Sequence, residues 1–229
     1  MNIRFLFLVL TSSFLIGTQS FAAENDLRQA LFTNADSAYQ RAMQVNANML
    51  APESFSTALE QYRDAETQLK RGGDIEAIKD SLNKAVKNFA KATSATKVAS
   101  VTLSDAWTAR DDAMSAGSQT HATKTWNKAE QRFVKAAEWL EDGRLKSAER
   151  ESETAQKMYR DAELEAIQAN LLSETRKTIA WVENSRYRRD IPITLNKAKE
   201  LLKQTENTLQ ENRYDTDTAR ILARRANHE

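Results

Sequence analysis

Apolar residues recur along most of the chain at alternating intervals of three and four positions. The clearest stretch places them at Phe55, Ala58, Tyr62, Ala65 and Leu69. This spacing keeps the apolar side chains on one stripe, which is typical of a helix that buries that stripe against other helices. The same spacing returns in two later stretches, at Trp126, Ala129, Phe133, Ala136, Leu140 and at Leu195, Ala198, Leu202, Thr205, Leu209. The sequence therefore predicts one kind of helix three times.

Each of these three helices has signals for its start and its end. Pro52 and Pro192 stand at matching positions before the first and third helices, where a first-turn proline costs no hydrogen bond. Thr123 takes this place before the second helix and can serve as its N-cap. Each helix ends at a residue that tolerates the left-handed backbone conformation, namely Gly72, Gly143 and Asn212.

A second periodic segment follows each of these helices. Its periodic positions have a matching register in the first two copies. They are Ile75, Ile78, Leu82, Ala85, Phe89, Ala92, Thr96 and Ala99 in the first, and Leu145, Ala148, Ser152, Ala155, Tyr159, Ala162, Ala166 and Ala169 in the second. A third such segment begins near Asp215, and its small residues are Ala219, Ala223 and Ala226. This last segment stops at Glu229, short of the length of the others. We therefore expect an incomplete third copy, either a frayed final helix or the remnant of a chain that once continued into another domain.

A third kind of helix precedes each of the first. Its positions in the first two copies share an offset of 71 residues, and they are Ala35, Ala38, Ala42, Met43 and Ala106, Ala109, Ala113, Met114. The third copy, around Thr175 to Asn184, keeps only Ile179 and Val182. Three helices with one buried stripe each, joined by short turns, predict an up-down-up bundle.

The predicted architecture is all-α: an elongated array of about three helical repeats of roughly 70 residues, each a spectrin-like bundle of three helices. The repeats are residues 23–100, residues 101–171 and the incomplete 172–229. Neither Gly nor Pro interrupts residues 74–116 or 144–191, so the last helix of one repeat is expected to continue into the next repeat. The alternative is an α-solenoid of helix pairs with a sharp break at each junction, and the β-branched and Ser-rich residues 100–104 permit a bend there.

The first residues have the pattern of a secretory signal. Arg4 precedes the apolar run from Phe5 to Ile16, which is too short to span a bilayer, and small residues at Ser20 and Ala22 fit cleavage after about Ala22. Residues 1–22 are therefore predicted to be a signal peptide, with an uncut membrane anchor as the alternative. No Cys follows for lipid attachment and nothing later is apolar enough to cross a membrane, so we expect a periplasmic protein.

Composition narrows the classes of function. The chain has no Cys, which excludes disulfides, thiolate nucleophiles and Cys-bound zinc. Its formal net charge of +1 gives no overall preference for nucleic acid or for an anionic membrane. The two histidines, His121 and His228, have no partners at metal-ligand spacing, and no nucleophile elbow, phosphate-binding loop or dinucleotide fingerprint occurs. We therefore expect neither an enzyme nor a bound cofactor or metal.

Two groups of residues are candidates for a partner or ligand surface. Trp107, Trp139 and Trp181 lie beside the main apolar stripes, where each either widens the core or stays exposed for a contact. Three arginines make the C-terminal portion locally basic, and they are Arg186, Arg188 and Arg189. Such a stretch is either an ordinary solvated loop or a contact for an anionic envelope polymer or lipid headgroup.

The stretch "LAPESFSTALEQYRDAETQLKRGG" with "AIKDSLNKAVKNFAKA" resembles an uncharacterised Ala-rich helical domain of bacterial envelope proteins. That domain is often found in lipoproteins or ahead of an OmpA-like peptidoglycan-binding domain. The resemblance implies an envelope location and a structural or tethering role, with an envelope protein or a peptidoglycan-associated component as partner. It implies no catalytic residues, and this chain carries neither the lipid-attachment Cys nor an OmpA-like domain. The expected function is a scaffold or spacer, and the alternative is a non-catalytic binding module for a cell-wall or small ligand.

Overall fold

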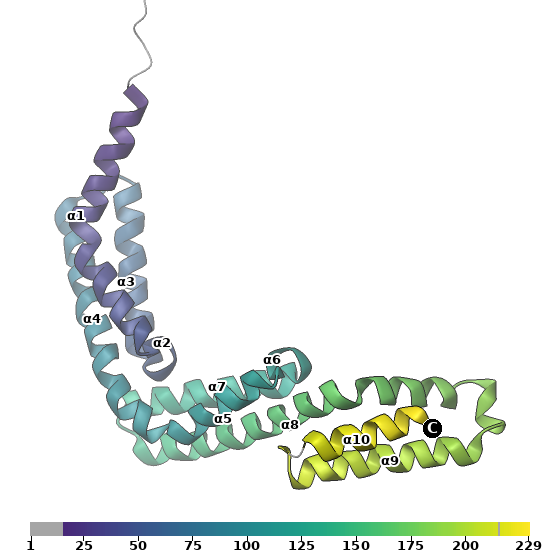
Figure 1. The fold of residues 1–229 in the computed structure, drawn as a ribbon. Coiled ribbons are helices and arrows are strands. Elements are labelled where there is room, and N and C mark those ends of the chain that lie inside the picture. Colours follow the sequence, from purple (N-terminus) through teal and green to yellow (C-terminus); the bar gives the residue numbers. More distant parts are fainter. Residues whose placement is uncertain (1–15, 215) are drawn as a thin grey trace, which may run out of the picture. The chain divides into compact units, whose positions relative to one another are not determined.

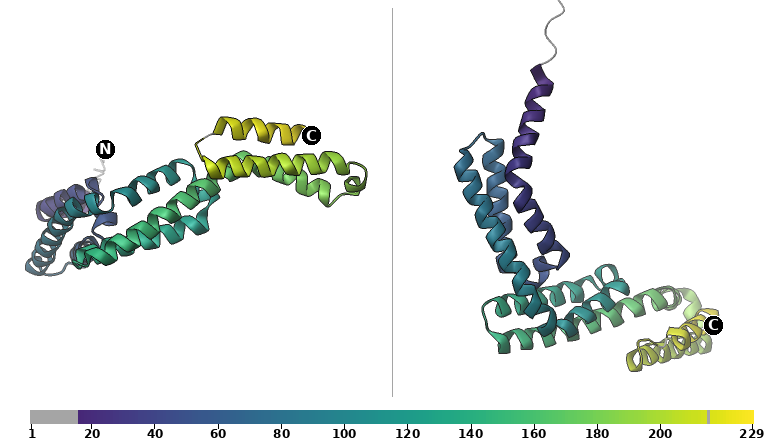
Figure 2. Two further views of the ribbon diagram at one scale, coloured as in Figure 1. Left: turned by 90° about the horizontal axis from the view of Figure 1, so that it is seen from below. Right: turned by 60° about the vertical axis from the view of Figure 1, so that its left-hand side comes forward.

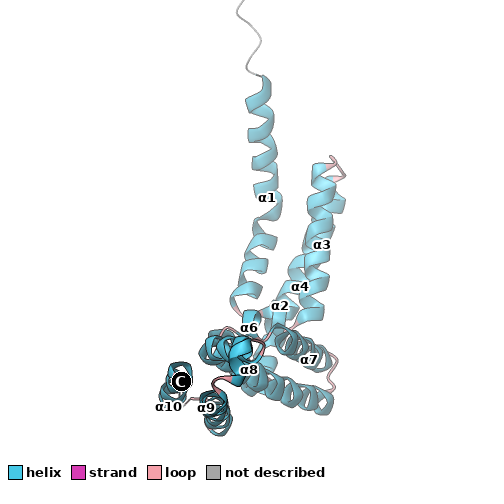
Figure 3. Ribbon diagram, turned by 90° about the vertical axis from the view of Figure 1, so that its right-hand side faces the viewer, coloured by secondary structure: helices cyan, strands magenta, loops and turns pink. Residues whose placement is uncertain are grey.

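The computed structural model describes residues 16–214 and 216–229, with side chains from Asn25 onward. Within that part of the chain every regular element is a helix and no strand occurs (Figures 1 and 3), so the predicted all-α class is confirmed. Residues 1–15 of the predicted signal peptide and Asp215, near the predicted start of the last helix, lie outside the described residues. No helix among the described residues is long and apolar enough to cross a membrane.

The chain forms two compact units. The first contains the residues up to Asn48 together with Glu53–Ser94, and the second contains Met49–Pro52 and Ala95–Glu229. The helices from the N-terminus to the end of the first unit are α1 (Ile16–Gln44), α2 (Ala47–Leu50), α3 (Pro52–Lys70) and α4 (Ile75–Thr102). The later helices are α5 (Ser104–Ser115), α6 (Ser118–His121), α7 (Thr123–Glu141), α8 (Leu145–Glu183), the 3₁₀ turn η1 (Arg186–Arg189), α9 (Pro192–Glu211) and α10 (Thr216–His228).

The core of the first unit lies between α1, α3 and α4, which run side by side (Figure 1). Phe32 of α1 is fully buried and packs with Ala65 of α3 and with Ile78 and Leu82 of α4. Small alanines on the same faces let the three helices approach closely, while the aromatic rings supply most of the buried apolar area. These helices therefore bury the stripes that the periodicity predicts.

The second unit contains two groups of three helices that share α8. α5 and α7 pack against the first part of α8, around Phe133 and Tyr159, and α9 and α10 pack against its last part, around Ile179 and Leu195 (Figure 2). The first of these cores is rich in aromatic rings, whereas the described core around Ile179 is aliphatic. One helix of 39 residues thus contributes a buried face to both cores.

The predicted helix starts are confirmed at all three positions, since α3, α7 and α9 begin at Pro52, Thr123 and Pro192. The predicted capping role of Thr123 is wrong, because Ala122 holds the N-cap position and the Thr123 hydroxyl donates to the Gln119 carbonyl at 2.9 Å. The short helix α6 ends immediately before α7, so that carbonyl is within reach of the threonine. α7 therefore begins at the predicted residue, but the side chain of Thr123 does not cap the helix as predicted.

The predicted helix ends are confirmed for the two glycines only. Gly72 and Gly143 have positive φ angles of 65° and 73°, which a residue without Cβ adopts at little cost. Asn212 is extended instead, with φ −143°, and its side-chain oxygen accepts the N–H of Tyr214 at 3.1 Å. The asparagine side chain can also stabilise an extended backbone by a hydrogen bond to a following N–H. The presence of Asn212 therefore did not specify a left-handed conformation at the helix end.

The apolar stripes reach less far than predicted at two helix starts. Ile75 and Leu145 open α4 and α8, and their side chains are 44 % and 48 % exposed. The next predicted positions, Ile78 and Ala148, are buried. The packing of each helix therefore begins about one turn after the helix itself.

The two junctions between the predicted repeats differ. α4 ends at Thr102 and α5 begins at Ser104, with the buried Leu103 between them at φ −104° and ψ 13°. This break lies within the stretch where the sequence permitted a bend, whose β-branched and serine residues are weak helix formers. At the second junction α8 continues without a break. The solenoid alternative, which required a sharp break at each junction, does not hold there.

Five aromatic rings lie together in the first unit, and three of them, Phe55, Tyr62 and Phe89, come from α3 and α4. The ring centroids of Phe55 and Phe89 are 5.5 Å apart with an interplanar angle of 64°. Those of Tyr62 and Phe89 are 6.5 Å apart at 66°. Both pairs have the edge-to-face arrangement that aromatic rings favour. Tyr39 of α1 contacts all three of these rings, at centroid distances of 6.0, 6.2 and 5.6 Å from Phe55, Tyr62 and Phe89. The aromatic cluster of the first unit thus joins α1, α3 and α4.

Three rings at the equivalent sequence positions lie together in the second unit. The ring centroids of Trp126 and Tyr159 are 5.4 Å apart at 60°, and those of Phe133 and Tyr159 are 6.3 Å apart at 61°. Here Tyr159 of α8 is the central ring and the other two come from α7. These three rings therefore have nearly the same geometry as Phe55, Tyr62 and Phe89 in the first unit, although the residue types differ.

Candidate functional site

The predicted basic stretch forms the turn between α8 and α9. η1 occupies Arg186–Arg189, and the carbonyl of Tyr187 accepts the N–H groups of Asp190 and Ile191 at 2.9 and 3.2 Å. These hydrogen bonds pair backbone N–H and C=O groups of the turn with one another. The side chains of the turn are therefore held on a defined backbone and face outward.

Four large apolar side chains are exposed at this turn. Trp181, in the last turn of α8, is 63 % exposed, and its ring lies 6.0 Å from that of Tyr187 between centroids. Tyr187 is 42 % exposed, Ile191 38 % and Ile193, in the first turn of α9, 83 %. Single exposed apolar residues are ordinary, but four within 13 consecutive residues form a patch. We call these four residues and Arg186, Arg188 and Arg189 the α8–α9 surface.

The arginines of the α8–α9 surface carry positive charge that nearby carboxylates do not neutralise. Arg186, Arg188 and Arg189 are exposed, and no carboxylate of the described residues lies within ion-pair distance of any of them. The guanidinium of Arg186 instead lies 5.2 Å from the centroid of the Tyr187 ring. All three arginines line a hollow of about 640 Å³ at the turn, together with the carboxylates of Glu183 and Asp190. The structure thus brings Trp181 together with the three arginines that the sequence singled out.

The other two candidate tryptophans lie elsewhere in the second unit. Trp107 of α5 is half-buried and packs on the aromatic core, 5.8 Å from Phe133 between ring centroids, so it widens the core as one of the two predicted alternatives stated. Trp139 of α7 is also half-buried, and the guanidinium of Arg144 lies 3.6 Å from the centroid of its ring. Among the described residues no ring contact joins Trp107, Trp139 and Trp181 to one another. They do not form one site.

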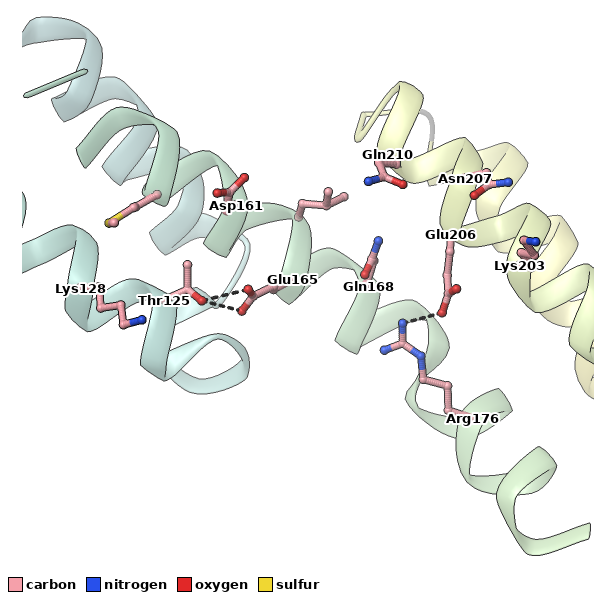
Figure 4. Close-up of a pocket in the computed structure, with 12 residues that line it drawn as sticks. Thr125, Lys128, Asp161, Glu165, Gln168, Arg176, Lys203, Glu206, Asn207 and Gln210 are labelled. Atoms are coloured by element: carbon pink, nitrogen blue, oxygen red, sulfur yellow. Dashed lines mark hydrogen bonds and ion pairs between the residues drawn. The ribbon is translucent and has the colours of Figure 1, made fainter. Parts of the chain in front are cut away.

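A polar groove of about 710 Å³ lies between α7, α8 and α9 (Figure 4). Thr125 of α7 donates to Glu165 of α8 at 2.9 Å, and Arg176 of α8 pairs with Glu206 of α9 at 2.7 Å. Most of the other lining side chains carry amide, ammonium or carboxylate groups, and they include Lys128, Asp161, Gln168, Lys203, Asn207 and Gln210. None of the three candidate tryptophans lines this groove.

The sequence did not predict this groove. Its lining residues occupy the polar faces of three amphipathic helices, and each face by itself looks like an ordinary solvated surface. The groove forms because α7 and α9 pack against different parts of their common neighbour α8. The sequence pattern of each helix does not show how the three helices pack together. Its array of hydrogen-bonding groups suits a polar ligand rather than an apolar one.

A buried carboxylate joins the connection between α9 and α10 to α8. Glu163 is only 3 % exposed and lies 3.2 Å from Arg160 and 3.2 Å from Arg213. Arg160 also pairs with Asp112 of α5 at 2.6 Å, and it donates to the hydroxyl of Tyr214 at 3.0 Å. Two guanidinium groups thus compensate the buried charge of Glu163, which makes this network a structural tie between helices.

A tyrosine, a carboxylate and an arginine form a polar cluster at the edge of each aromatic cluster. In the first unit Tyr62 donates to Asp36 at 2.5 Å, and Arg28 donates to both, at 3.0 and 3.3 Å. Burial raises the pKa of Tyr62 to about 12, and the hydrogen bond to the Asp36 carboxylate contributes to this rise. The phenol therefore stays protonated and donates its hydrogen bond throughout the physiological pH range.

The corresponding polar cluster of the second unit is more deeply buried. Tyr159 is fully buried and donates to Glu130 at 2.5 Å, and Arg110 holds the same carboxylate through two bonds of 2.7 and 3.2 Å. Burial, followed by the hydrogen bond to Glu130, raises the pKa of Tyr159. The Tyr159 phenol therefore stays protonated and keeps its hydrogen bond to Glu130.

Among the described residues no three His, Cys, Asp or Glu side chains gather as metal ligands would. The comparisons with models of protein families, with curated proteins and with solved structures found no match to this chain. The α8–α9 surface and the polar groove are the two candidate sites of the described residues.

Proposed function

We propose that this chain is a non-catalytic scaffold or spacer of the bacterial cell envelope, exported to the periplasm with cleavage after about Ala22. It would hold an envelope protein or a peptidoglycan-associated component at a docking surface. The observation that carries this proposal is the division of the chain into successive groups of three helices, each with its own core. Such an array presents long helical surfaces without requiring a central cavity.

Two further observations support the proposal. The apolar run and small residues at positions 5–22 have the pattern of a cleaved secretory signal. The α8–α9 surface offers exposed aromatic and arginine side chains, which are enriched at docking surfaces. An exported chain with a repeated helical framework and one such surface fits a tethering role better than a catalytic one.

The export part of the proposal is tested by the mass of the protein in a periplasmic extract. We expect a chain that begins near Ala23. The variant Leu6→Arg/Leu8→Arg, which interrupts the apolar run, should remain unprocessed in the cytoplasm. Recovery of the wild-type chain in the cytoplasm with residues 1–22 intact would contradict the proposal.

The scaffold part is tested by photo-crosslinking in intact cells. A photoreactive amino acid at position 193 should give a discrete crosslink to an exported component, because Ile193 is 83 % exposed within the α8–α9 surface. The same amino acid at position 101 is the control, since Val101 is 75 % exposed and lies outside that surface. Equal crosslinking patterns from the two positions would count against a docking role.

The polar groove favours a second candidate function, a non-catalytic binding module for a cell-wall or small polar ligand. Its amide and charged side chains come from three helices and offer hydrogen bonds in several directions. Titration with soluble peptidoglycan fragments tests this candidate by calorimetry. Binding by the wild type that the variant Gln168→Ala/Asn207→Ala loses, and that the exposed control Gln119→Ala keeps, would support it. Absence of binding by the wild type would reject it.

A further inference from the structure

We infer that the α8–α9 surface docks on the headgroup layer of a bilayer that contains anionic phospholipids. The inference deepens the proposed function and rests on it, since it names what the exposed surface of an envelope scaffold contacts. Three features of the turn favour such a partner: its exposed apolar side chains, its arginines without ion-pair partners, and the repulsion expected between the positive charges of two copies.

The apolar residues of the turn match the chemistry of a membrane interface. Trp181 and Tyr187 are exposed and adjacent, and rings that combine an apolar body with a polar N–H or O–H group concentrate at the level of lipid headgroups. Ile193 is 83 % exposed and has no polar group, so water is an unfavourable environment for it. Shallow insertion of these side chains removes apolar surface from water without any membrane-spanning segment.

The arginines supply the complementary charge. The five residues 186–190 contain three arginines and one carboxylate, Asp190. The nearby carboxylate of Glu183 already pairs with Lys199 of α9, so it does not compensate the arginines. A planar guanidinium forms paired hydrogen bonds with a phosphate group, and the hollow of about 640 Å³ that these arginines line has room for a phospholipid headgroup.

Other occupants fit the surface less well. A second copy of this chain on a twofold axis would place the same patch on both partners and bring the arginines toward one another. A glycan strand with carboxylates would satisfy the arginines but would leave Ile193 and Trp181 without an apolar layer to enter. An anionic bilayer provides both an apolar and a negatively charged layer within the reach of one turn.

Vesicle co-sedimentation tests the charge requirement, with the chain purified from cells and its start defined by mass. We expect binding to vesicles of phosphatidylglycerol and phosphatidylethanolamine, weaker binding in high salt, and little binding to phosphatidylcholine vesicles. Because each arginine near an anionic surface is worth roughly a fivefold change in affinity, the variant Arg186→Ala/Arg188→Ala/Arg189→Ala should bind on the order of 100-fold more weakly.

A matched variant controls for loss of positive charge in general. Lys146, Arg150 and Lys157 are exposed on the first part of α8 and have no ion-pair partner among the described residues. The variant Lys146→Ala/Arg150→Ala/Lys157→Ala removes the same charge but leaves the turn intact. It should keep most of the affinity for the phosphatidylglycerol vesicles. An equal loss in both triple variants would overturn the assignment to the turn.

Fluorescence quenching tests the apolar part. Lipids brominated on their acyl chains should quench the tryptophan emission of the bound protein, and Trp181→Phe should lose this quenching while it retains charge-dependent binding. Ile193→Ser should weaken binding about tenfold, because an isoleucine loses its apolar burial. Val101→Ser, an equally exposed position outside the α8–α9 surface, should leave affinity unchanged. Circular dichroism of each variant checks that it folds.

The possible outcomes separate this inference from the proposed function. Binding to purified sacculi that depends on Arg186, Arg188 and Arg189, without binding to vesicles, would overturn the lipid assignment and favour a wall polymer. Self-association abolished by Trp181→Phe would overturn it in favour of a second copy. An exported protein that ignores anionic vesicles defeats the inference alone. A chain that binds vesicles but is never exported defeats the proposed function instead.

Discussion

The two units contain an equivalent pair of packed rings but place the hydroxyl group on different members of the pair. In the first unit the pair is Tyr62 on α3 and Phe89 on α4, and in the second it is Phe133 on α7 and Tyr159 on α8. The distances between ring centroids, 6.5 and 6.3 Å, and the interplanar angles, 66° and 61°, are nearly equal. The positions on the helices therefore determine the packing of the rings, and either ring can carry the polar group.

The two polar clusters differ in their exposure to water. The side chains of Arg28 and Asp36 are 41 % and 39 % exposed, whereas those of Arg110 and Glu130 are 15 % and 25 % exposed. Water and salt screen the first pair more than the second. The same combination of tyrosine, carboxylate and arginine should therefore contribute more to the stability of the second unit than to that of the first.

Replacement of a core ring should have the largest effect and should differ between the units. Phe133→Ala is expected to lower the free energy of unfolding of the second unit by about 3 to 5 kcal/mol, because a fully buried aromatic ring leaves a cavity. Tyr62→Ala should cost less, since Tyr62 is only partly buried. All four tryptophans belong to the second unit, so their fluorescence during urea denaturation reports on it. An unchanged transition for Phe133→Ala would contradict the assigned inner face of α7.

Removal of the hydroxyl group alone should separate the two polar clusters. Tyr159→Phe deprives the Glu130 carboxylate of a buried hydrogen bond and should cost about 1 to 3 kcal/mol. Tyr62→Phe acts at a more exposed carboxylate and should cost about 0.5 to 1.5 kcal/mol. Urea denaturation followed by circular dichroism measures both. A larger cost for Tyr62→Phe would reverse the comparison.

Replacement of the two carboxylates by amides should give a smaller difference in stability cost between the units. The larger cost is again expected in the second unit. Glu130→Gln leaves Arg110 partly buried without its charge partner and should cost about 1 to 2 kcal/mol. Asp36→Asn breaks an exposed pair and should cost about 0 to 1 kcal/mol. The stability of Asp36→Asn should also be less sensitive to added salt than that of the wild type. Salt-independent, equal costs for both variants would show that screening does not distinguish the clusters.

The alkaline pH dependence of stability tests the polar cluster of the first unit without a substitution. The pKa of Tyr62 is about 12 in the folded chain, above the value of 10.0 for a free tyrosine. The contribution of the protonated phenol is therefore fully present below pH 10 and is lost as the pH rises from about 10 to about 12. Spectrophotometric titration near 295 nm measures the ionisation, with Tyr62→Phe as the control. A Tyr62 that titrates near pH 10 would contradict the observed hydrogen bond to Asp36.

The sequence predicted the buried faces well because periodicity encodes them directly. Alternating intervals of three and four residues identified Phe89, Phe133 and Tyr159 as core positions, and each is fully buried. The prolines and glycines at the helix ends also act locally, so their neighbours in sequence were enough to locate the turns. Asn212 shows the limit, since a side chain that can satisfy the backbone in several ways does not specify one conformation.

The polar contacts between helices were not predictable in the same way. Glu163 lies next to an apolar stripe, but its burial depends on Arg213, which is 50 positions away in the sequence. The carboxylates that accept the tyrosine hydroxyl groups lie on different helices in the two units. Asp36, the acceptor of Tyr62, is on α1, and Glu130, the acceptor of Tyr159, is on α7. Periodicity indicates which side of a helix is polar, but not which neighbouring helix approaches it. The candidate residues Trp181, Arg186, Arg188 and Arg189 were identifiable because they are neighbours along the chain.

The unbroken helix α8 has a consequence for how the second unit responds to load and to local opening. Its 39 residues extend for about 58 Å at 1.5 Å per residue, and its two ends belong to different cores. Bending or fraying of α8 at one core therefore disturbs the continuous backbone hydrogen bonds that lead to the other core. A force applied at the α8–α9 surface is thus transmitted along the stiff α8 helix to the rings around Tyr159. A tether attached at the turn is therefore anchored by a core several helical turns away.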